Sequence, residues 1–344
     1  MDTQNSYFQK KKTVVSFVLS LFVFYIHFRV FSVFRNADGF LGCVFDQLII
    51  FTKVAVPLFF IISGALFYRD YNLRLTIKKW KNRFVSLCIP YLVWNTVWFI
   101  IALLGNYTPL GTLLGGVKAT LSLENILRGV FLYGYFEPFW FIFQLIIMTA
   151  ACPLIYLLLR NKWIGLAWII AVFIALCFGF RFNTWLFPNS NMVLIYLIGA
   201  WIGIHHFSFF TERRSKLHAL AGFFVYILCC VFHGVMNPVP EWCITFQTPL
   251  LVTIISCGAF WIAFDYFDVK LCPQYMSHSF LIYALHSFIG AAISKTTNMI
   301  LPPTQGYLLL TAIITFPLTI IFICIIGRLL DSYFPLLKRI LTGR

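Results

Sequence analysis

The sequence predicts an all-α membrane protein, built as a polytopic bundle of about ten transmembrane helices. Of its 344 residues, 61% are hydrophobic and only 11% are charged, and the mean hydropathy is +0.88. A soluble domain needs more charge than this to cover its surface. Long apolar runs also recur from one end of the chain to the other, and a helix of about 20 such residues crosses a bilayer.

The apolar runs predict ten spans within a single integral-membrane domain that covers residues 1–344. The predicted spans are 13–34, 48–68, 84–104, 139–159, 163–180, 192–207, 217–235, 248–267, 279–294 and 306–327. The first run is too long for a signal peptide and lacks a small-residue cleavage site, so we predict that it is retained. The sequence shows no clear internal repeat, so it does not support an inverted-repeat transporter.

The segments between the spans are mostly short. Residues 1–12 are polar and basic, which predicts a cytoplasmic tail. The longest outer loop is predicted at 105–138, and its apolar-rich piece 121–133 predicts a short helix lying on the membrane. Any chemistry is therefore expected within the bundle or at its faces.

The distribution of charge predicts the orientation of the bundle. A formal net charge of +15 is compatible with nucleic-acid binding, but the position of the charges argues against it. Segments predicted to face the cytoplasm hold 19 of the 26 Lys and Arg residues, and the outer side and outer halves of spans hold 7. This is the positive-inside asymmetry, so both termini are expected in the cytoplasm.

Residues 54–69 form an apolar helix that contains a Ser63-Gly64 pair in its middle. A glycine lets two helices approach closely in a membrane, so Gly64 predicts tight helix packing. Ser63 lacks the G-x-S-x-G frame of a serine nucleophile.

A basic hinge follows this helix at 69–83. It carries six positive charges on the predicted inner side. Such a run is either a topological signal or a site for the phosphates of a nucleotide-like donor from the cytoplasm. In the second case Arg69, Lys79 and Arg83 are the candidate donor-binding residues.

His27 is the first candidate for catalysis. It lies about fourteen residues into the first span, which at 1.5 Å per residue places it roughly 21 Å from the inner edge, in the outer third of the bilayer. Lys53 is predicted at nearly the same depth, and Arg29 lies two residues beyond His27. A neutral histidine can take a proton from a hydroxyl, and nearby cations can stabilise an oxyanion. Alternatively, the two cations reach the headgroups and His27 bonds a neighbouring helix.

The other histidines divide into two groups. His286 is predicted in the middle of the ninth span, where it either supports catalysis or makes an interhelical hydrogen bond. Four others fall at inner ends of spans, where a solvated role is expected: His205, His206, His218 and His278. The ten cysteines form no CxxC pair and no Cys/His cluster with metal-ligand spacing, so no metal site is predicted.

Five patches in this order resemble the acyltransferase-3 family of bacterial integral-membrane acyltransferases. They are Phe24-Tyr25-Ile26-His27-Phe28, Val56 to Gly64, Lys79 to Phe84 with Ile89 to Trp94, Phe139-Trp140-Phe141-Ile142 and Ile282-Tyr283-Ala284-Leu285-His286. Together with the ten-span layout they cover nearly the whole chain. Each patch alone is weak, whereas the ordered set is fairly specific.

The resemblance implies that the chain moves an acyl group, commonly acetyl from acetyl-CoA, onto a hydroxyl of a cell-envelope glycan. It also implies that His27 is the catalytic base, with Trp140 of the fourth patch as a candidate supporting residue. Two departures from the family pattern bear on donor binding. Ser16 stands where the family often has an arginine, and Glu137-Pro138 stand where it often has a histidine.

We therefore predict an O-acyltransferase of the bacterial inner membrane, with acyl-CoA as donor substrate, no bound cofactor and no nucleic-acid partner. The acceptor is expected to be a glycan or a lipid-linked sugar, and Glu137 and Asp46 are candidate acidic partners of His27 on the outer side. Two alternatives stay open, namely a transporter or exporter of a lipid-linked glycan, which the 19% aromatic content would suit, and a sensor without turnover. A homo-oligomer is compatible with the sequence.

Overall fold

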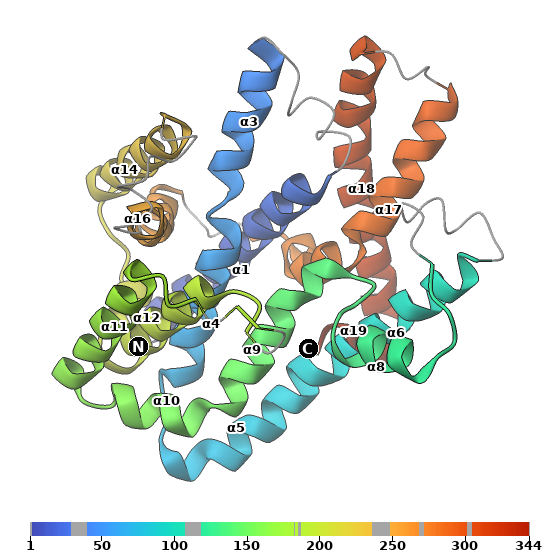
Figure 1. Cartoon of the computed structure of the whole chain (residues 1–344). Helices are drawn as coiled ribbons and strands as arrows, with labels where there is room; N and C mark the ends of the chain where they lie inside the picture. Colours follow the sequence, from blue (N-terminus) through green and yellow to red (C-terminus); the bar gives the residue numbers. More distant parts are fainter. Residues whose placement is uncertain are drawn as a thin grey trace. The chain divides into compact units, whose positions relative to one another are not determined.

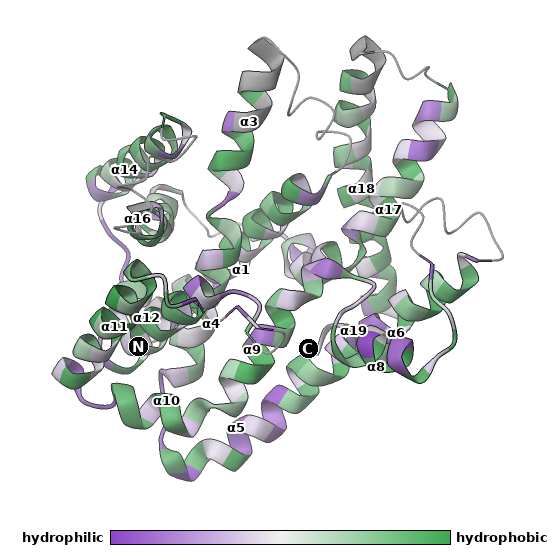
Figure 2. Ribbon diagram, viewed as in Figure 1, coloured by the Kyte–Doolittle hydropathy of each residue, from purple (hydrophilic) through white to green (hydrophobic). Residues whose placement is uncertain are grey.

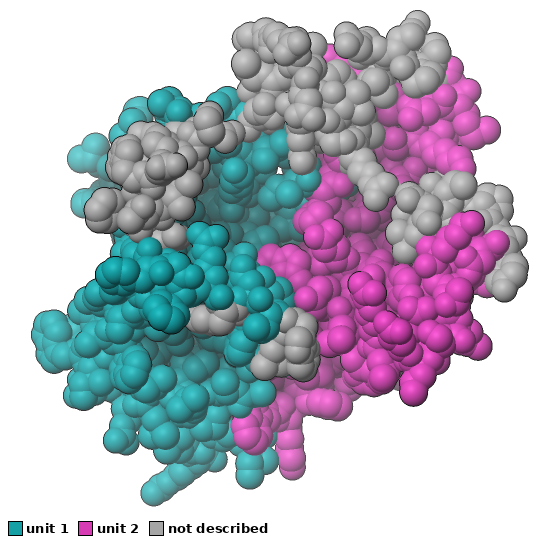
Figure 3. Space-filling view, in the orientation of Figure 1, with its two compact units in different colours: residues 1–26, 43–78, 147–276 teal, residues 27–42, 79–146, 277–344 magenta. Residues whose placement is uncertain are grey.

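The computed structural model describes residues 2–28, 40–106, 118–181, 183–184, 187–235, 248–267, 272–300 and 305–343. All regular secondary structure in these ranges is helical, as Figure 1 shows, so the predicted all-α class is confirmed for them. The chain divides into two compact units, which Figure 3 colours separately. One unit comprises residues 1–26, 43–78 and 147–276, and the other comprises 27–42, 79–146 and 277–344.

The first unit holds most of the helices from the N-terminal third and the middle of the chain. They are α1 (Asp2–His27), α3 (Phe40–Thr52), α4 (Ala55–Tyr68), α10 (Cys152–Leu159), α11 (Lys162–Cys177), α12 (Ser190–His205), α13 (Ser208–Thr211), α14 (Lys216–Val235) and α16 (Thr248–Ala263). The second unit holds most of α5 (Thr76–Arg83) and α9 (Trp140–Ala150), together with α6 (Ile89–Leu104), α8 (Leu123–Phe131), α17 (Ser279–Ile300), α18 (Gln305–Tyr333) and α19 (Pro335–Thr342).

Six helices in the described ranges are long and apolar enough to cross a membrane. They are Gln47–Tyr68, Leu73–Leu104, Lys216–Val235, Pro249–Tyr266, Gln274–Ile300 and Leu309–Tyr333. Figure 2 shows hydrophobic residues along most of the ribbon, and large apolar side chains such as Phe224 and Ile313 are exposed, as expected for faces that meet lipid. The chain is a multi-pass membrane protein.

The remaining predicted spans are shorter or interrupted. Two of them, 163–180 and 192–207, correspond to α11 and α12, which are apolar but only 16 residues long each. The predicted span 139–159 is bent by 67° between α9 and α10. Pro153 lies in the first turn of α10, where a proline is tolerated but cannot continue the preceding helix. Counting this bent pair as one span gives seven.

The third predicted span begins earlier than the hydropathy suggests. The basic hinge and the span form one continuous helix, Leu73–Leu104, which includes α5, a π-helical turn at Phe84–Cys88 and α6. Residues 73–83 of the basic hinge are thus the first part of a long helix. Figure 2 shows the hydrophilic residues of α5 on that part of the ribbon.

Close packing of α4 against α12 forms the interior of the first unit. A Cβ added to Gly64 would come within 2.6 Å of the Tyr196 carbonyl oxygen, and Gly199 and Gly203 lie against the backbone of Ile61 and Ala65. These small residues allow the two backbones to touch. The predicted role of Gly64 is confirmed.

The N-terminal segment is more ordered than a polar tail. Helix α1 begins at Asp2, so residues 2–12 continue the apolar helix, and Lys11 is fully buried. The burial of Lys11 could not be predicted from this basic segment, because its ion-pair partner Asp265 lies more than 250 positions away in the sequence.

In the second unit, α17 packs against α18, and α19 packs against α6. The Trp94 indole donates to the Leu341 carbonyl at 2.8 Å, which ties the end of the chain to α6. The predicted helix at 121–133 is confirmed as α8, and the Ser122 hydroxyl caps it by accepting from the Asn125 amide.

Candidate functional site

His27 ends α1 and belongs to the second unit. Its side chain is exposed, whereas Phe28 beside it is buried and packs edge-on against Phe316 of α18 at 6.2 Å. The carbonyl groups of the last turn of a helix favour a positive charge. An imidazolium formed when His27 takes a proton would therefore lie in a favourable place.

The structure brings His286 to His27. The two ring centroids are 5.5 Å apart, with an interplanar angle of 49°. His286 is fully buried on α17, and its Nδ1 lies 2.9 Å from the Tyr283 carbonyl oxygen and 3.1 Å from that of Ile282. Two histidines that are about 260 positions apart in the sequence thus form one pair.

An aromatic wall encloses the buried member of the pair. The Phe136 ring lies 6.2 Å from the His286 ring and stacks in parallel on Trp98 at 4.4 Å. Phe139 stacks on Tyr283 at 5.5 Å, and the Tyr283 hydroxyl donates to the Pro138 carbonyl. The site is therefore polar at the two imidazoles and apolar around them.

Glu137 and Trp140 lie on the segment that this hydrogen bond anchors to α17. Glu137 begins the short 3₁₀ turn Glu137–Phe139 and is exposed, and Trp140 begins α9 and is half-buried. The structure thus places the Glu137-Pro138 pair next to the helix that carries His286. Asp46 lies in α3, with its side chain outside the described residues.

The two cations predicted at the depth of His27 are Arg29 and Lys53. Arg29 lies outside the described residues. Lys53 is exposed at the break between α3 and α4 and belongs to the first unit.

The candidate donor-binding residues fall on two neighbouring segments. Arg69 follows α4, lies over the Phe207 ring at 4.7 Å and pairs with the exposed Asp70 at 3.4 Å. Lys79 and Arg83 are one turn apart on α5 and half-buried, whereas Lys78 and Lys81 are exposed. Since positions i and i+4 share a helix face, Lys79 and Arg83 form one partly covered pair.

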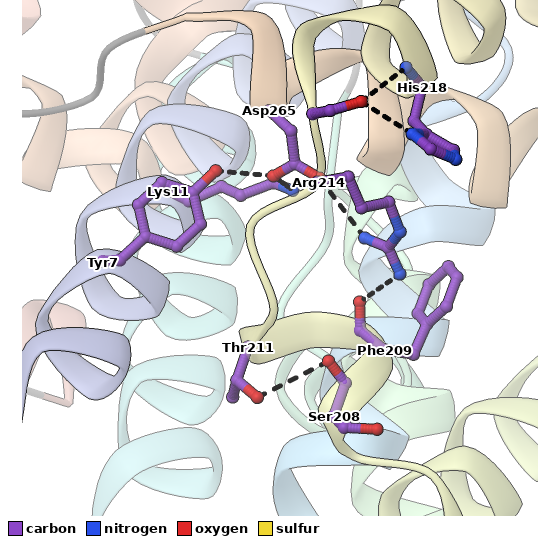
Figure 4. A network of polar contacts seen from close by, with 9 residues as sticks. Tyr7, Lys11, Ser208, Phe209, Thr211, Arg214, His218 and Asp265 are labelled. Atoms are coloured by element: carbon purple, nitrogen blue, oxygen red, sulfur yellow. Dashed lines mark hydrogen bonds and ion pairs between the residues drawn. The ribbon is translucent and has the colours of Figure 1, made fainter. Parts of the chain in front are cut away.

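A buried ionic network in the first unit was not predicted from the sequence. Figure 4 shows Asp265, which is 1% exposed, accepting hydrogen bonds from the Tyr7 hydroxyl and the Lys11 ammonium, each at 2.5 Å. The Arg214 guanidinium donates to the other carboxylate oxygen at 3.3 Å and to the Phe209 carbonyl at 2.9 Å. The network joins the start of α1, the loop after α13 and the 3₁₀ turn Phe264–Tyr266 that follows α16.

Burial and charge oppose each other in this network. Burial lowers the pKa of Lys11 to about 8, and the Asp265 carboxylate acts in the opposite direction. Burial and the hydrogen bond to Asp265 raise the pKa of Tyr7 well above its usual range. The Lys11 ammonium also lies over the Trp261 ring at 4.4 Å, which compensates part of its lost hydration. A lone aspartate at the end of an apolar run was the one signal in the sequence for this site.

The prediction of a solvated His278 is wrong. Its side chain is buried, and its Nε2 lies 2.9 Å from the Asp331 carboxylate, which also pairs with Lys338. The physical reason is Gly327 of α18, where a Cβ would come within 2.6 Å of the His278 ring. The missing side chain lets α18 cover the imidazole.

The comparison with protein families decides between an enzyme and a transporter. The acyltransferase domain, family 3, matches residues 15–328, which is most of the chain. This chain belongs to the acyltransferase 3 family. It is a membrane acyltransferase, and the resemblance seen in the five patches is confirmed. No curated protein and no solved structure gives a significant match.

Membership assigns acyl transfer to this acyltransferase and favours that activity over glycan export. The matched range 15–328 includes both histidines of the pair, His27 and His286. An acyl donor and an acceptor are therefore its partners.

Proposed function

We propose that this acyltransferase moves an acyl group, in the simplest case acetyl, from acyl-CoA to a hydroxyl of a cell-envelope glycan or lipid-linked sugar, with His27 as the general base. The observation that carries the proposal is the exposed imidazole of His27 beside the buried His286 within the family's domain. Because the His27 side chain is exposed, a substrate hydroxyl can reach its ring.

The transfer needs one proton to move twice. A ring nitrogen of His27 takes the proton of the acceptor hydroxyl as its oxygen attacks the thioester carbonyl, so a C–O bond forms. The C–S bond then breaks, and the imidazolium returns the proton to the thiolate of the leaving CoA. A base with a pKa near the working pH suits this exchange, which an imidazole supplies with little tuning.

The donor is proposed to enter from the cytoplasm and the acceptor from the outer side of a bacterial inner membrane. This orientation rests on the 19-to-7 distribution of basic residues. The phosphates of acyl-CoA are proposed to meet Arg69, Lys79 and Arg83, because guanidinium and ammonium groups make strong charge-assisted bonds to phosphate.

The proposal is tested by His27→Ala and His27→Gln. Both are expected to insert at the normal level, because the His27 side chain is exposed and contributes little to packing. Both should lower turnover on the order of 10²–10⁴-fold, the usual contribution of a positioned base. The measurement is acyl-CoA consumption by protein in membranes or detergent.

The glutamine variant decides the role. Glutamine forms hydrogen bonds but takes no proton at neutral pH, so a base cannot be replaced by it. Activity in His27→Gln together with inactivity in His27→Ala would assign His27 a hydrogen-bonding role and reject it as the base.

A further inference from the structure

The inference concerns what holds the proposed base in place, and it starts from the backbone around His286. Both contacts of its Nδ1 are carbonyl oxygens, those of Ile282 and Tyr283. Because a carbonyl oxygen only accepts, Nδ1 carries the hydrogen, and in the neutral ring the lone pair lies on Nε2. The hydrogen-bond network thus assigns the tautomer of His286.

The surroundings keep this ring neutral. His286 is fully buried, with the Phe136 ring at 6.2 Å. The Trp98 ring stacks on Phe136, and its centroid lies 6.2 Å from that of the Phe288 ring. A charged imidazolium in this apolar setting would lose its hydration without gaining a counter-ion among these side chains. Two charged rings with centroids 5.5 Å apart would also repel, so the pair holds at most one added proton.

We propose that His286 is the positioning residue of the base: its neutral Nε2 accepts the N–H of His27 and aims the other His27 nitrogen at the acceptor hydroxyl. The structure does not contain this bond at the His286 Nε2, but a ring-centroid separation of 5.5 Å leaves it within reach of a reorientation of the exposed His27 side chain. The proposal rests on the proposed function, since it takes His27 as the base. In this proposal a neutral histidine orients the catalytic base. In many enzymes a carboxylate has this role beside a catalytic histidine.

The position of the carboxylates supports a histidine in this role. Glu137 is exposed on its 3₁₀ turn, and the Tyr283 hydroxyl bonds the carbonyl of the neighbouring Pro138. The buried carboxylate Asp265 is already shared by Tyr7, Lys11 and Arg214. Among the side chains that the structure describes around the His27 ring, His286 is a buried acceptor with its orientation fixed.

The proposed step moves no proton to His286. The hydroxyl proton goes to one nitrogen of His27, the N–H on the other nitrogen stays bonded to His286, and the imidazolium later protonates the leaving thiolate. An acceptor that bonds this N–H stabilises the imidazolium. Removing the acceptor therefore shifts the rise of activity with pH towards lower pH and leaves the base poorly aimed.

The experiment uses His286→Phe and His286→Gln in the full chain. Phenylalanine fills the aromatic enclosure but accepts no hydrogen bond, so turnover should fall roughly 10–100-fold, as when the partner of a functional histidine is removed. The KM for acyl-CoA should stay unchanged, and the midpoint of the pH–activity profile should move to lower pH. Glutamine keeps an acceptor oxygen and should recover about a third or more of the activity.

The matched control is Tyr283→Phe, on the same helix and also buried. It removes the hydrogen bond from the Tyr283 hydroxyl to the Pro138 carbonyl and leaves both histidines. It should lower thermal stability without moving the pH midpoint. A shift in Tyr283→Phe equal to that in His286→Phe would overturn the proposal, since packing alone would then explain it.

Two further outcomes separate this inference from the proposed function. If His27→Gln is inactive while His286→Phe has full turnover and an unchanged pH midpoint, only the role of His286 is rejected. If His286→Gln is as inactive as His27→Gln, His286 itself must exchange a proton, which also overturns the inference. The double variant His27→Ala/His286→Phe should be no slower than His27→Ala alone, because both changes disable one unit. Where His286→Phe does not fold, the glutamine variant and its pH profile decide.

Discussion

At the scale of single residues, the sequence indicates which buried polar groups exist but not which of them meet. His27 and His286 are both predictable as candidates, because each lies deep in an apolar run and within a patch that resembles the family. Their contact was not predictable, because neither periodicity nor charge indicates which helices become neighbours. Asp265 and His278 were missed or misassigned because their partners, Lys11 and Asp331, lie far away in the sequence.

Asp265→Asn tests the buried network at the same scale. The substitution keeps the size of the side chain but removes the charge that balances Lys11, which is 0% exposed. Leaving one buried partner uncompensated costs about 3–5 kcal/mol, so the purified protein should unfold at a clearly lower temperature. Differential scanning fluorimetry in detergent measures the change.

The control for this variant is Asp70→Asn, whose carboxylate pairs with Arg69 but is 77% exposed. An exposed pair contributes little, so the melting temperature should hardly change. The double variant Lys11→Met/Asp265→Leu removes the two fully buried charges and leaves the partly exposed Arg214. It should recover most of the loss, since a buried pair can be replaced by apolar side chains at little cost. A double variant as unstable as Asp265→Asn would show that charge compensation is not what the network provides.

At the scale of helices, hydropathy located the elements well and their ends less well. Gly64 indicated a close helix contact, and the structure shows it against α12. The start of the long helix at Leu73 was not predicted, because a hydropathy profile cannot show that a basic segment continues an apolar helix. The bend between α9 and α10 was not predicted either, because both helices are apolar. The same long helix carries the proposed donor-binding cations.

The donor prediction follows from the two faces of α5. Replacing Lys79 or Arg83 with Gln should raise the KM for acyl-CoA about tenfold or more, since a charge-assisted bond contributes about 1.5–3 kcal/mol. Arg69→Gln should act in the same direction. Steady-state kinetics at fixed ionic strength provide the measurement.

Lys78→Gln and Lys81→Gln are the matched controls, because both lysines are exposed on the same turn of helix. Their KM should stay within about twofold of the original, as expected for charges that act only at long range in salt. Equal increases in all the variants would indicate general attraction of an anion to a basic surface. No increase in Arg69, Lys79 and Arg83 variants would leave the hinge with a topological role alone.

At the scale of the whole molecule, the family and the all-α class were predictable from the sequence. The number of spans was not, because it depends on how long a helix must be to count as a span. The matched domain at 15–328 accounts for most of the chain. The described helices include six candidate spans, or seven with the bent pair, against ten predicted runs. The difference arises at α11 and α12, which are 16 residues long each, and at the first run, of which the described helix α1 covers residues 13–27.

The topology can be measured directly, because an even number of spans leaves both termini on one side and an odd number separates them. Ten spans with the positive-inside orientation predict that reporters at Met1, at Arg344 and after Arg83, Lys162 and Arg214 all report the cytoplasm. Reporters at Gly115 and Glu241 should report the outer side. Paired alkaline phosphatase and green fluorescent protein fusions give opposite signals on the two sides and control for expression. A cytoplasmic signal at Gly115, or termini on opposite sides, would contradict the ten-span arrangement, and the second result would also require the donor and acceptor sides to be assigned again.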